Sequence, residues 1–183
     1  MDDVAVVGWH PATTGGDGPR VRLDWRRFAY AGKFVMTNTG KAVIRGGESD
    51  PDSEFDESVL AAVAFNEDRT DDRTLWLRYV TVRADRRGEG LGPRLCDAVA
   101  ERALARGYDR VRIAVNNPFA YEALYKAGFG FTGRETGIAE LVLERPAETS
   151  RSRYRDGLDR FRERDLGDDE RAFLDGRRNL PGE

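Results

Sequence analysis

The middle of the chain contains an apolar segment ending at Val82, then a glycine-rich turn, then a segment with helical periodicity. The turn reads Arg87-Gly88-Glu89-Gly90-Leu91-Gly92. Glycine adopts backbone conformations that a side chain forbids, so successive N–H groups can converge on one point. At the start of a helix these groups meet the positive end of the helix dipole and form an anion site. Arg86 adds charge beside Arg87, so the sequence predicts a site for a phosphorylated ligand.

Other phosphate-binding motifs fit this turn poorly. A Walker loop requires Lys followed by Ser or Thr after its last glycine, and neither pair follows Gly92. A dinucleotide fingerprint has the spacing Gly-x-Gly-x-x-Gly and an acidic residue after the next strand, where this chain has Asn116. A nucleotide-binding regulator remains a weaker alternative, and so does a glycine-rich turn that binds nothing.

Composition narrows the classes of partner. A formal net charge of −3 gives no reason to expect nucleic-acid binding, and the longest apolar run, 59–65, is too short to span a bilayer. The chain starts with acidic residues, and its single cysteine, Cys96, excludes an internal disulfide. One cysteine and one histidine cannot build a typical zinc site, and we expect His10 in a surface loop. We therefore expect a cytoplasmic protein that binds no metal, membrane or nucleic acid.

Hydrophobic periodicity predicts strands separated by two clear helices. The expected strands are Val4–Val7, Lys41–Ile44, Val59–Phe65, Leu75–Val82, Val111–Val115, Phe129–Thr132 and Ile138–Leu143. The segment 59–82 reads as a hairpin, and the segment Leu23–Phe28 as the possible start of a helix. The clear helices are expected over 90–106, ending at Gly107, and from Pro118 to Ala127, ending at Gly128.

A charged extension follows Pro146, which we take as the end of a domain spanning 1–146. Within 147–183, Tyr154, Leu158 and Phe161 recur at helical spacing and form a narrow apolar stripe. Asp168 or Asp169 is expected to cap a second short helix. We interpret the extension as a solvated helical tail docked by one edge, and keep a dimerisation arm or a lid as the alternative.

Two motifs in this order resemble the GNAT superfamily of acetyl-CoA-dependent N-acetyltransferases. The family's pyrophosphate motif, Gln/Arg-x-x-Gly-x-Gly/Ala, is matched by Arg87, Gly90 and Gly92. A second motif, an Asn-x-x-Ala followed by Leu-Tyr and Gly-Phe, is matched by Asn117-Pro118-Phe119-Ala120, Leu124-Tyr125 and Gly128-Phe129. The interval between Ala120 and Leu124 is one residue longer than in the family pattern. The resemblance covers about residues 58–144.

The resemblance implies an α/β fold of the acyltransferase type: a mixed, mostly antiparallel sheet, splayed between Val80 and the strand ending at Val115, with helices on both faces. It implies acetyl-CoA as co-substrate, with an amide N–H near Val82 polarising the thioester carbonyl. It makes Tyr125 the general acid that protonates the leaving thiolate, whereas tyrosine packing alone is the alternative. The residues that it assigns to cofactor binding are Val80, Thr81, Val82, Arg86, Arg87, Gly88, Gly90, Leu91, Gly92 and Asn117.

The general base is not evident, because the strands where the family often carries a glutamate contain no carboxylate here. Glu67 and Asp68 are candidates that would act through water, although a solvated hairpin loop is the interpretation we favour. The expected function is acetyl transfer to a primary amine of a small molecule or peptide. A homodimer is kept as an open alternative for the assembly. The acidic residues within 48–57 could attract a cationic acceptor, or they could form a solvated loop without such a role. The alternative function is a catalytically silent CoA-binding sensor or interaction module.

Overall fold

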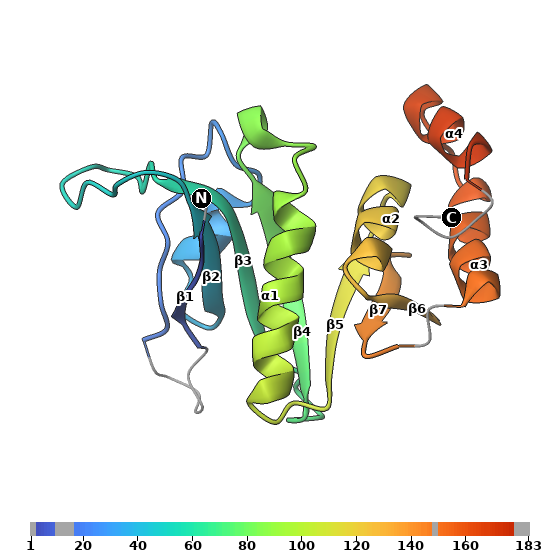
Figure 1. Ribbon diagram of the computed structural model, residues 1–183, viewed down its shortest axis with the longest axis horizontal. Coiled ribbons are helices and arrows are strands. Elements are labelled where there is room, and N and C mark those ends of the chain that lie inside the picture. Colours follow the sequence, from blue (N-terminus) through green and yellow to red (C-terminus); the bar gives the residue numbers. More distant parts are fainter. Residues whose placement is uncertain (1–2, 10–16, 148–149, 178–183) are drawn as a thin grey trace. The chain divides into compact units, whose positions relative to one another are not determined.

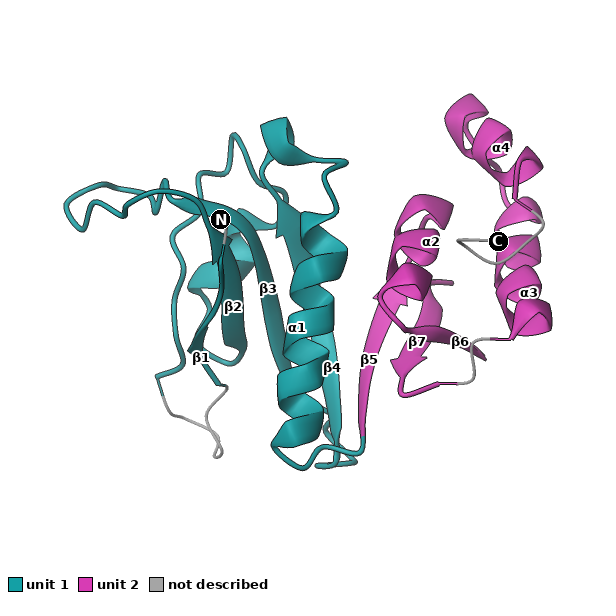
Figure 2. Ribbon diagram, viewed as in Figure 1, with its two compact units in different colours: residues 1–109 teal, residues 110–183 magenta. Residues whose placement is uncertain are grey.

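The computed structural model describes residues 3–9, 17–147 and 150–177. Contacts between Cα atoms divide the chain into two compact units, residues 1–109 and residues 110–183 (Figure 2). Each unit is described by itself. His10, expected in a surface loop, lies outside the described residues.

Unit 1 is built on four antiparallel strands that neighbour one another in chain order (Figure 1). They are β1 (Asp3–Gly8), β2 (Gly40–Arg45), β3 (Val59–Glu67) and β4 (Thr74–Val82). The helix α1 (Leu91–Ala105) packs against these strands with Leu95, Val99 and Ala103 fully buried. These strands, the hairpin and the helix match the sequence predictions closely, because each has an apolar pattern long enough to identify its period.

The other face of this sheet is covered by the segment 21–36, not by a regular helix. Phe28 and Phe34 from this segment form a core with Val43 and Ala62 of the sheet. The helix proposed from Leu23 to Phe28 is wrong: this stretch forms turns, followed by a short 3-10 helix η1 (Ala31–Val35). The carboxylate of Asp24 accepts the backbone N–H of Arg26 over 3.0 Å. Such a local bond stabilises a turn in competition with a helix.

A β-bulge interrupts β4. Ala64 of β3 lies opposite Tyr79, but the next residue of β3, Phe65, lies opposite Leu77, so Arg78 is the extra residue. A bulge bends the strand locally and redirects its side chains. Tyr79 packs against the core cluster formed by the segment 21–36, on the face of the sheet away from α1.

Unit 2 contains three antiparallel strands in the order β5-β7-β6. Its elements are β5 (Arg110–Val115), α2 (Pro118–Lys126), β6 (Gly130–Glu135), β7 (Leu141–Arg145), α3 (Arg151–Arg162) and α4 (Asp168–Asp175). Pro118 occupies the first turn of α2 as predicted, and Gly128 follows the helix with φ 89°. The predicted start of the last strand at Ile138 is wrong. Ala139 has φ 62° and its N–H donates to the Thr136 carbonyl, which makes a turn there.

The C-terminal extension supplies part of the core of unit 2. The side chains of Tyr154 and Leu158 on α3 are completely buried, and Phe161 is 1% exposed. The predicted cap of the next helix by Asp168 or Asp169 is wrong, because Gly167 is the N-cap and its N–H donates to the Glu170 carboxylate. A domain boundary after Pro146 stays a prediction.

The predicted fold class, a mixed α/β fold with mostly antiparallel strands and a helical C-terminal segment, is confirmed. The predicted splay concerns strands from different units and stays a prediction. Among the residues that the structure describes, no helix combines the length and the apolar character needed to cross a membrane.

Candidate functional site

The glycine turn adopts the backbone conformation that its sequence predicts. Gly88 has φ +85° and Gly90 has φ +79°, both in the region that side chains rarely adopt. A Cβ built at either position would meet no atom within 4 Å. Glycine is therefore required here for backbone conformation, not for space.

The turn leads directly into the N-terminus of α1, with Gly90 as the N-cap. Because glycine has no side chain, the first N–H groups of the helix receive no side-chain cap, whereas serine or aspartate normally supplies one. Leu91 and Gly92 therefore present backbone donors at the positive end of a 15-residue helix. This arrangement can bind a phosphate supplied from outside the chain.

Gly92 also brings the start of α1 against β4. A Cβ at Gly92 would lie 3.5 Å from Val82 Cγ2 and 3.8 Å from Val80 Cγ1, so these two valines face the helix. Thr81 alternates with them, is 4% exposed, and its hydroxyl is buried with no hydrogen-bond partner among the described residues. The side chains here are apolar or, at Thr81, buried. The backbone is therefore the part of Val80, Thr81 and Val82 that is suited to bind a ligand.

The two arginines of the turn differ in their surroundings. Arg86 Nε lies 2.7 Å from Glu89 Oε2, an ion pair that spans the turn. Arg87 is exposed and has an extended backbone. Sequence reasoning missed Glu89, although its spacing of three residues from Arg86 indicates such a pair. The structure thus brings together the predicted residues from Val80 to Gly92 within unit 1.

Asn117, the predicted cofactor-binding residue of unit 2, has a clear structural contact. It is the N-cap of α2, and its side-chain oxygen accepts the N–H of Ala120 over 2.8 Å. Its side-chain amide donates to Asn116 Oδ1 over 3.2 Å. A role for Asn117 in binding CoA stays a prediction.

Tyr125, the predicted general acid, is almost buried inside unit 2, with 6% of its surface exposed. Its hydroxyl oxygen accepts the backbone N–H of Phe131 over 2.9 Å. Its ring packs against Tyr121, with 5.0 Å between centroids, and against Tyr154, with 4.8 Å. Burial, and beyond it the Tyr125 hydroxyl, raises the pKa of Tyr121 far above its ordinary value.

These tyrosines form a cluster that sequence reasoning did not find. The Tyr121 hydroxyl donates to the backbone carbonyl of Tyr154 over 3.0 Å, which joins α2 to the C-terminal extension. A Cβ at Gly157 of α3 would collide with the Tyr121 hydroxyl. The only hint in the sequence is a glycine inside an otherwise helical segment, and such a glycine often marks a close approach.

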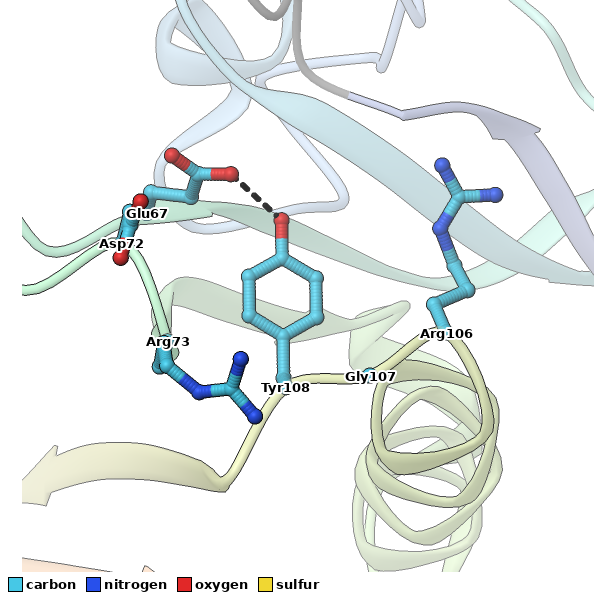
Figure 3. A pocket seen from close by; sticks show the side chains of 6 residues that line it. All are labelled: Glu67, Asp72, Arg73, Arg106, Gly107 and Tyr108. Carbon is cyan, nitrogen blue, oxygen red and sulfur yellow. Dashed lines mark hydrogen bonds between the residues drawn. The ribbon is translucent and has the colours of Figure 1, made fainter.

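The two carboxylates considered as bases lie at the hairpin end of unit 1. Glu67 accepts the Tyr108 hydroxyl over 2.8 Å and lines an open cavity of about 410 Å³ with Arg106 and Arg73 (Figure 3). Asp68 accepts the backbone N–H of Thr70, its hydroxyl and the indole N–H of Trp76. These bonds, the backbone one foremost, lower the pKa of Asp68 to about 2. A carboxylate with so low a pKa is a poor base.

Strand register sets the separation between these carboxylates and the glycine turn. Ala61 lies opposite Val82, and Glu67 lies opposite Leu75. Glu67 is six positions after Ala61 on β3, which corresponds to about 20 Å of extended strand. The cavity around Glu67 is thus at the other end of the hairpin from the glycine turn. No group of three or more potential metal ligands occurs in the described parts of the chain.

Comparison with known proteins identifies the family. A model of the Acetyltransferase (GNAT) family matches residues 29–131, more than half of the chain. Among solved structures, an N-acetyltransferase from Staphylococcus aureus Mu50 is 19% identical (TM-score 0.47), with 58% of this chain and 66% of that chain covered. Nourseothricin acetyltransferase is 17% identical (TM-score 0.49), with 78% and 96% covered.

A Bacillus subtilis acetyltransferase solved in complex with CoA is 18% identical (TM-score 0.45), with 58% of this chain and 75% of that chain covered. No curated protein matches the sequence. The family assignment rests on the family model, which spans the glycine turn, β4 and the whole of α2. The chain belongs to the GNAT family of acetyltransferases.

Proposed function

We propose that this protein transfers an acetyl group from acetyl-CoA to a primary amine, and that the glycine turn binds the phosphates of CoA. The observation that carries the proposal is the pair of positive-φ glycines, Gly88 and Gly90, placed directly before an α-helix without a side-chain cap. Such a terminus offers converging N–H donors and a positive dipole to a phosphate. Family membership supports acetyl-CoA as the phosphorylated ligand.

The residues present fit this ligand. The backbone donors come from Gly88, Gly90, Leu91 and Gly92, and the positive charge from Arg86 and Arg87. The backbone of Val80, Thr81 and Val82 is proposed to pair with the pantetheine arm, and Asn117 to contact the cofactor from unit 2. The thioester supplies an activated acyl group.

In the proposed reaction the acceptor nitrogen attacks the thioester carbonyl carbon, so that a C–N bond forms and the C–S bond breaks. An amide N–H of β4 near Val82 stabilises the negative charge that develops on the carbonyl oxygen. Tyr125 is the proposed donor of a proton to the leaving thiolate. Its place in the Leu-Tyr motif supports this role. The acceptor loses its own proton to solvent, since both candidate carboxylates are engaged at the hairpin end.

A second function, CoA binding without turnover, is favoured by one specific observation. The Tyr125 hydroxyl is buried and already bonded to Phe131 and adjacent to Tyr121. In a sensor or interaction module these contacts would serve packing alone. Such a protein would bind CoA, and would still bind it after Tyr125→Phe, but would acetylate no amine.

A thermal-shift measurement with acetyl-CoA, CoA and NAD tests the binding half of the proposal. A ligand that binds only the folded state stabilises it by about 2.7 kcal/mol at a hundredfold excess over the dissociation constant. We expect both CoA ligands to raise Tm, NAD to leave it unchanged, and Gly90→Glu to abolish the shift. Gly107→Glu is the matched control, because Gly107 also has a positive φ, +103°, but follows the opposite end of α1.

Thiol release in the presence of an amine panel then separates the two functions. Acetyl transfer supports the enzyme, whereas CoA binding without transfer to any amine supports the silent module. If neither CoA ligand shifts the Tm of a correctly folded protein, both the enzyme and the silent CoA-binding module are excluded. A cytoplasmic location and a homodimer stay predictions, to be checked by fractionation and by light scattering.

A further inference from the structure

A patch of aromatic rings and cations lies on the face of unit 1 that α1 does not cover. Its members come from the segment 21–36 and from β4, and we call it the β4 patch: Tyr30, Lys33, Trp76, Arg78 and Tyr79. Tyr79 packs against the core on this face, and Trp76 alternates with the buried residues Leu75 and Leu77. The bulge at Arg78 therefore leaves Trp76 and Tyr79 on the same side of the strand.

Each cation of the patch lies over a ring. Lys33 Nζ is 5.5 Å from the centroid of the Tyr79 ring, and Arg78 Cζ is 5.1 Å from the centroid of Trp76. The Tyr30 ring lies 5.6 Å from that of Tyr79. These side chains form two groups, one around Tyr79 and one around Trp76, that follow each other along β4 on either side of the bulge.

The conformation of Tyr30 indicates that the position of its ring matters. Its φ is 59°, in the left-handed region that is unusual for a bulky residue. Such a conformation is unfavourable for a residue with a side chain and persists only where neighbouring structure holds it. Here Phe28 before Tyr30 and Ala31 after it are both buried in the core. Yet the Tyr30 side chain remains 56% exposed, so burial of Tyr30 does not explain the strain.

The charges of the patch favour an anion. Arg78 Nε donates to a neutral partner, Asn66 Oδ1, over 2.7 Å. Across residues 3–9, 17–147 and 150–177, neither Lys33 nor Arg78 forms a salt bridge within 4 Å. Burial lowers the pKa of Arg78; the negative charge of Asp68 acts against this shift, and the positive charge of Arg69 adds to it. A positively charged amine alone would be repelled by this pair of cations, whereas a carboxylate would be attracted.

We infer that the β4 patch binds the acceptor, and that the acceptor is a small amine carrying a carboxylate, as an amino acid does. This inference rests on the proposed function. Because α1 covers one face of β4, we place the acceptor on the other face, beside the segment 21–36, where the patch lies. The carboxylate is held by Lys33 and Arg78, and the rings of Tyr30 and Tyr79 pack against the apolar part. The amine then forms the C–N bond as the C–S bond of the thioester breaks, and the thiolate takes up a proton.

The test compares three matched acceptors: phenylalanine, its neutral amide and phenethylamine. Repeating the series with leucine shows whether an aromatic side chain matters. We expect kcat/KM for the amino acid to exceed that for the amide at least tenfold. Lys33→Met and Arg78→Gln should each reduce this preference several-fold, and Lys33→Arg should keep it. Lys126→Met on α2 is the control, since Lys126 lies in the other unit and pairs with Glu122.

A binding measurement keeps the inference testable without turnover. In calorimetry, the CoA-saturated protein should bind N-acetylphenylalanine with a dissociation constant at least tenfold lower than that of its amide. Lys33→Met should remove this difference. Equal use or binding of acid and amide, or a preference unchanged in both variants, would overturn the inference while leaving acetyl transfer intact. Selective binding of the acid without any acetyl transfer would support the patch and overturn the proposed enzyme.

Discussion

Gly157 of α3 lies directly beneath the hydroxyl of Tyr121 on α2, at a point where no side-chain carbon fits between the two helices. This approach lets the Tyr121 hydroxyl donate to the Tyr154 carbonyl and lets the two rings stack, with 5.5 Å between centroids. The C-terminal extension is thereby packed onto the motif that contains Tyr125.

Replacing Gly157 by alanine should destabilise the protein by about 1–3 kcal/mol, because an extra methyl group in a packed interface forces the helices apart. Urea unfolding checks this. Gly176→Ala is the matched control: a Cβ there meets only ordinary contacts, the nearest atom at 3.7 Å. Equal stability of the two variants would show that α3 can shift without cost.

Tyr125→Phe removes the proposed acid while keeping the ring that packs against Tyr121 and Tyr154. We expect kcat to fall about 100-fold with unchanged CoA binding, a loss typical of removing a general acid. Tyr121→Phe is the control, since it also removes a buried hydroxyl of this cluster. An equal effect of both variants, or none in Tyr125→Phe, would make Tyr125 a packing residue.

The buried Lys41 of β2 should make stability depend on alkaline pH. Its ammonium donates to the carbonyls of Met36 and Thr39 and to the Thr39 hydroxyl, and burial lowers the pKa of Lys41 to about 8. Between pH 8 and the ordinary lysine pKa, the unfolded chain binds more protons than the folded one, so stability rises with pH.

Relative to Lys41→Met, the wild-type free energy of unfolding should therefore increase from pH 8 to 10, on the order of 1–3 kcal/mol. Denaturant titrations at several pH values measure it, with the exposed Lys33→Met as control. Parallel curves for wild type and Lys41→Met would indicate that the three acceptors keep the ammonium charged across this range.

Asp68 should contribute to stability in acid. Its carboxylate accepts bonds from Thr70 and from the Trp76 indole, which depress its pKa from 3.8 to about 2. A depressed carboxyl pKa stabilises the fold above about pH 4, and this contribution is lost as pH falls toward 2. Asp68→Asn should flatten the stability profile in this window, and Trp76→Phe should flatten it partly. If Asp68→Asn loses stability between about pH 4 and pH 2 as steeply as the wild type, Asp68 is not the group responsible.

The sequence predicted the elements whose patterns are local. The helix after the glycine turn, the hairpin of β3 and β4, and the helix starting at Pro118 agree with the structure, because hydrophobic period and capping residues act over a few positions. The helix predicted at 23–28 is absent because the Asp24 side chain binds a backbone N–H and so stabilises a turn in place of a helix. The predicted start of the last strand is too early because Ala139 has a left-handed backbone conformation. Glycine or asparagine usually marks such a position, and here the residue is alanine.

By itself the sequence determined the glycine turn, since φ values forbidden to other residues are a local property of Gly88 and Gly90. Only the tertiary structure decided that Gly157 fits against Tyr121, that Tyr125 is enclosed by Tyr154, and that Tyr30, Lys33 and Tyr79 share one surface. These relationships join residues far apart in the chain. They depend on packing and register, which follow from the interior as a whole and leave no periodic signal in any one segment.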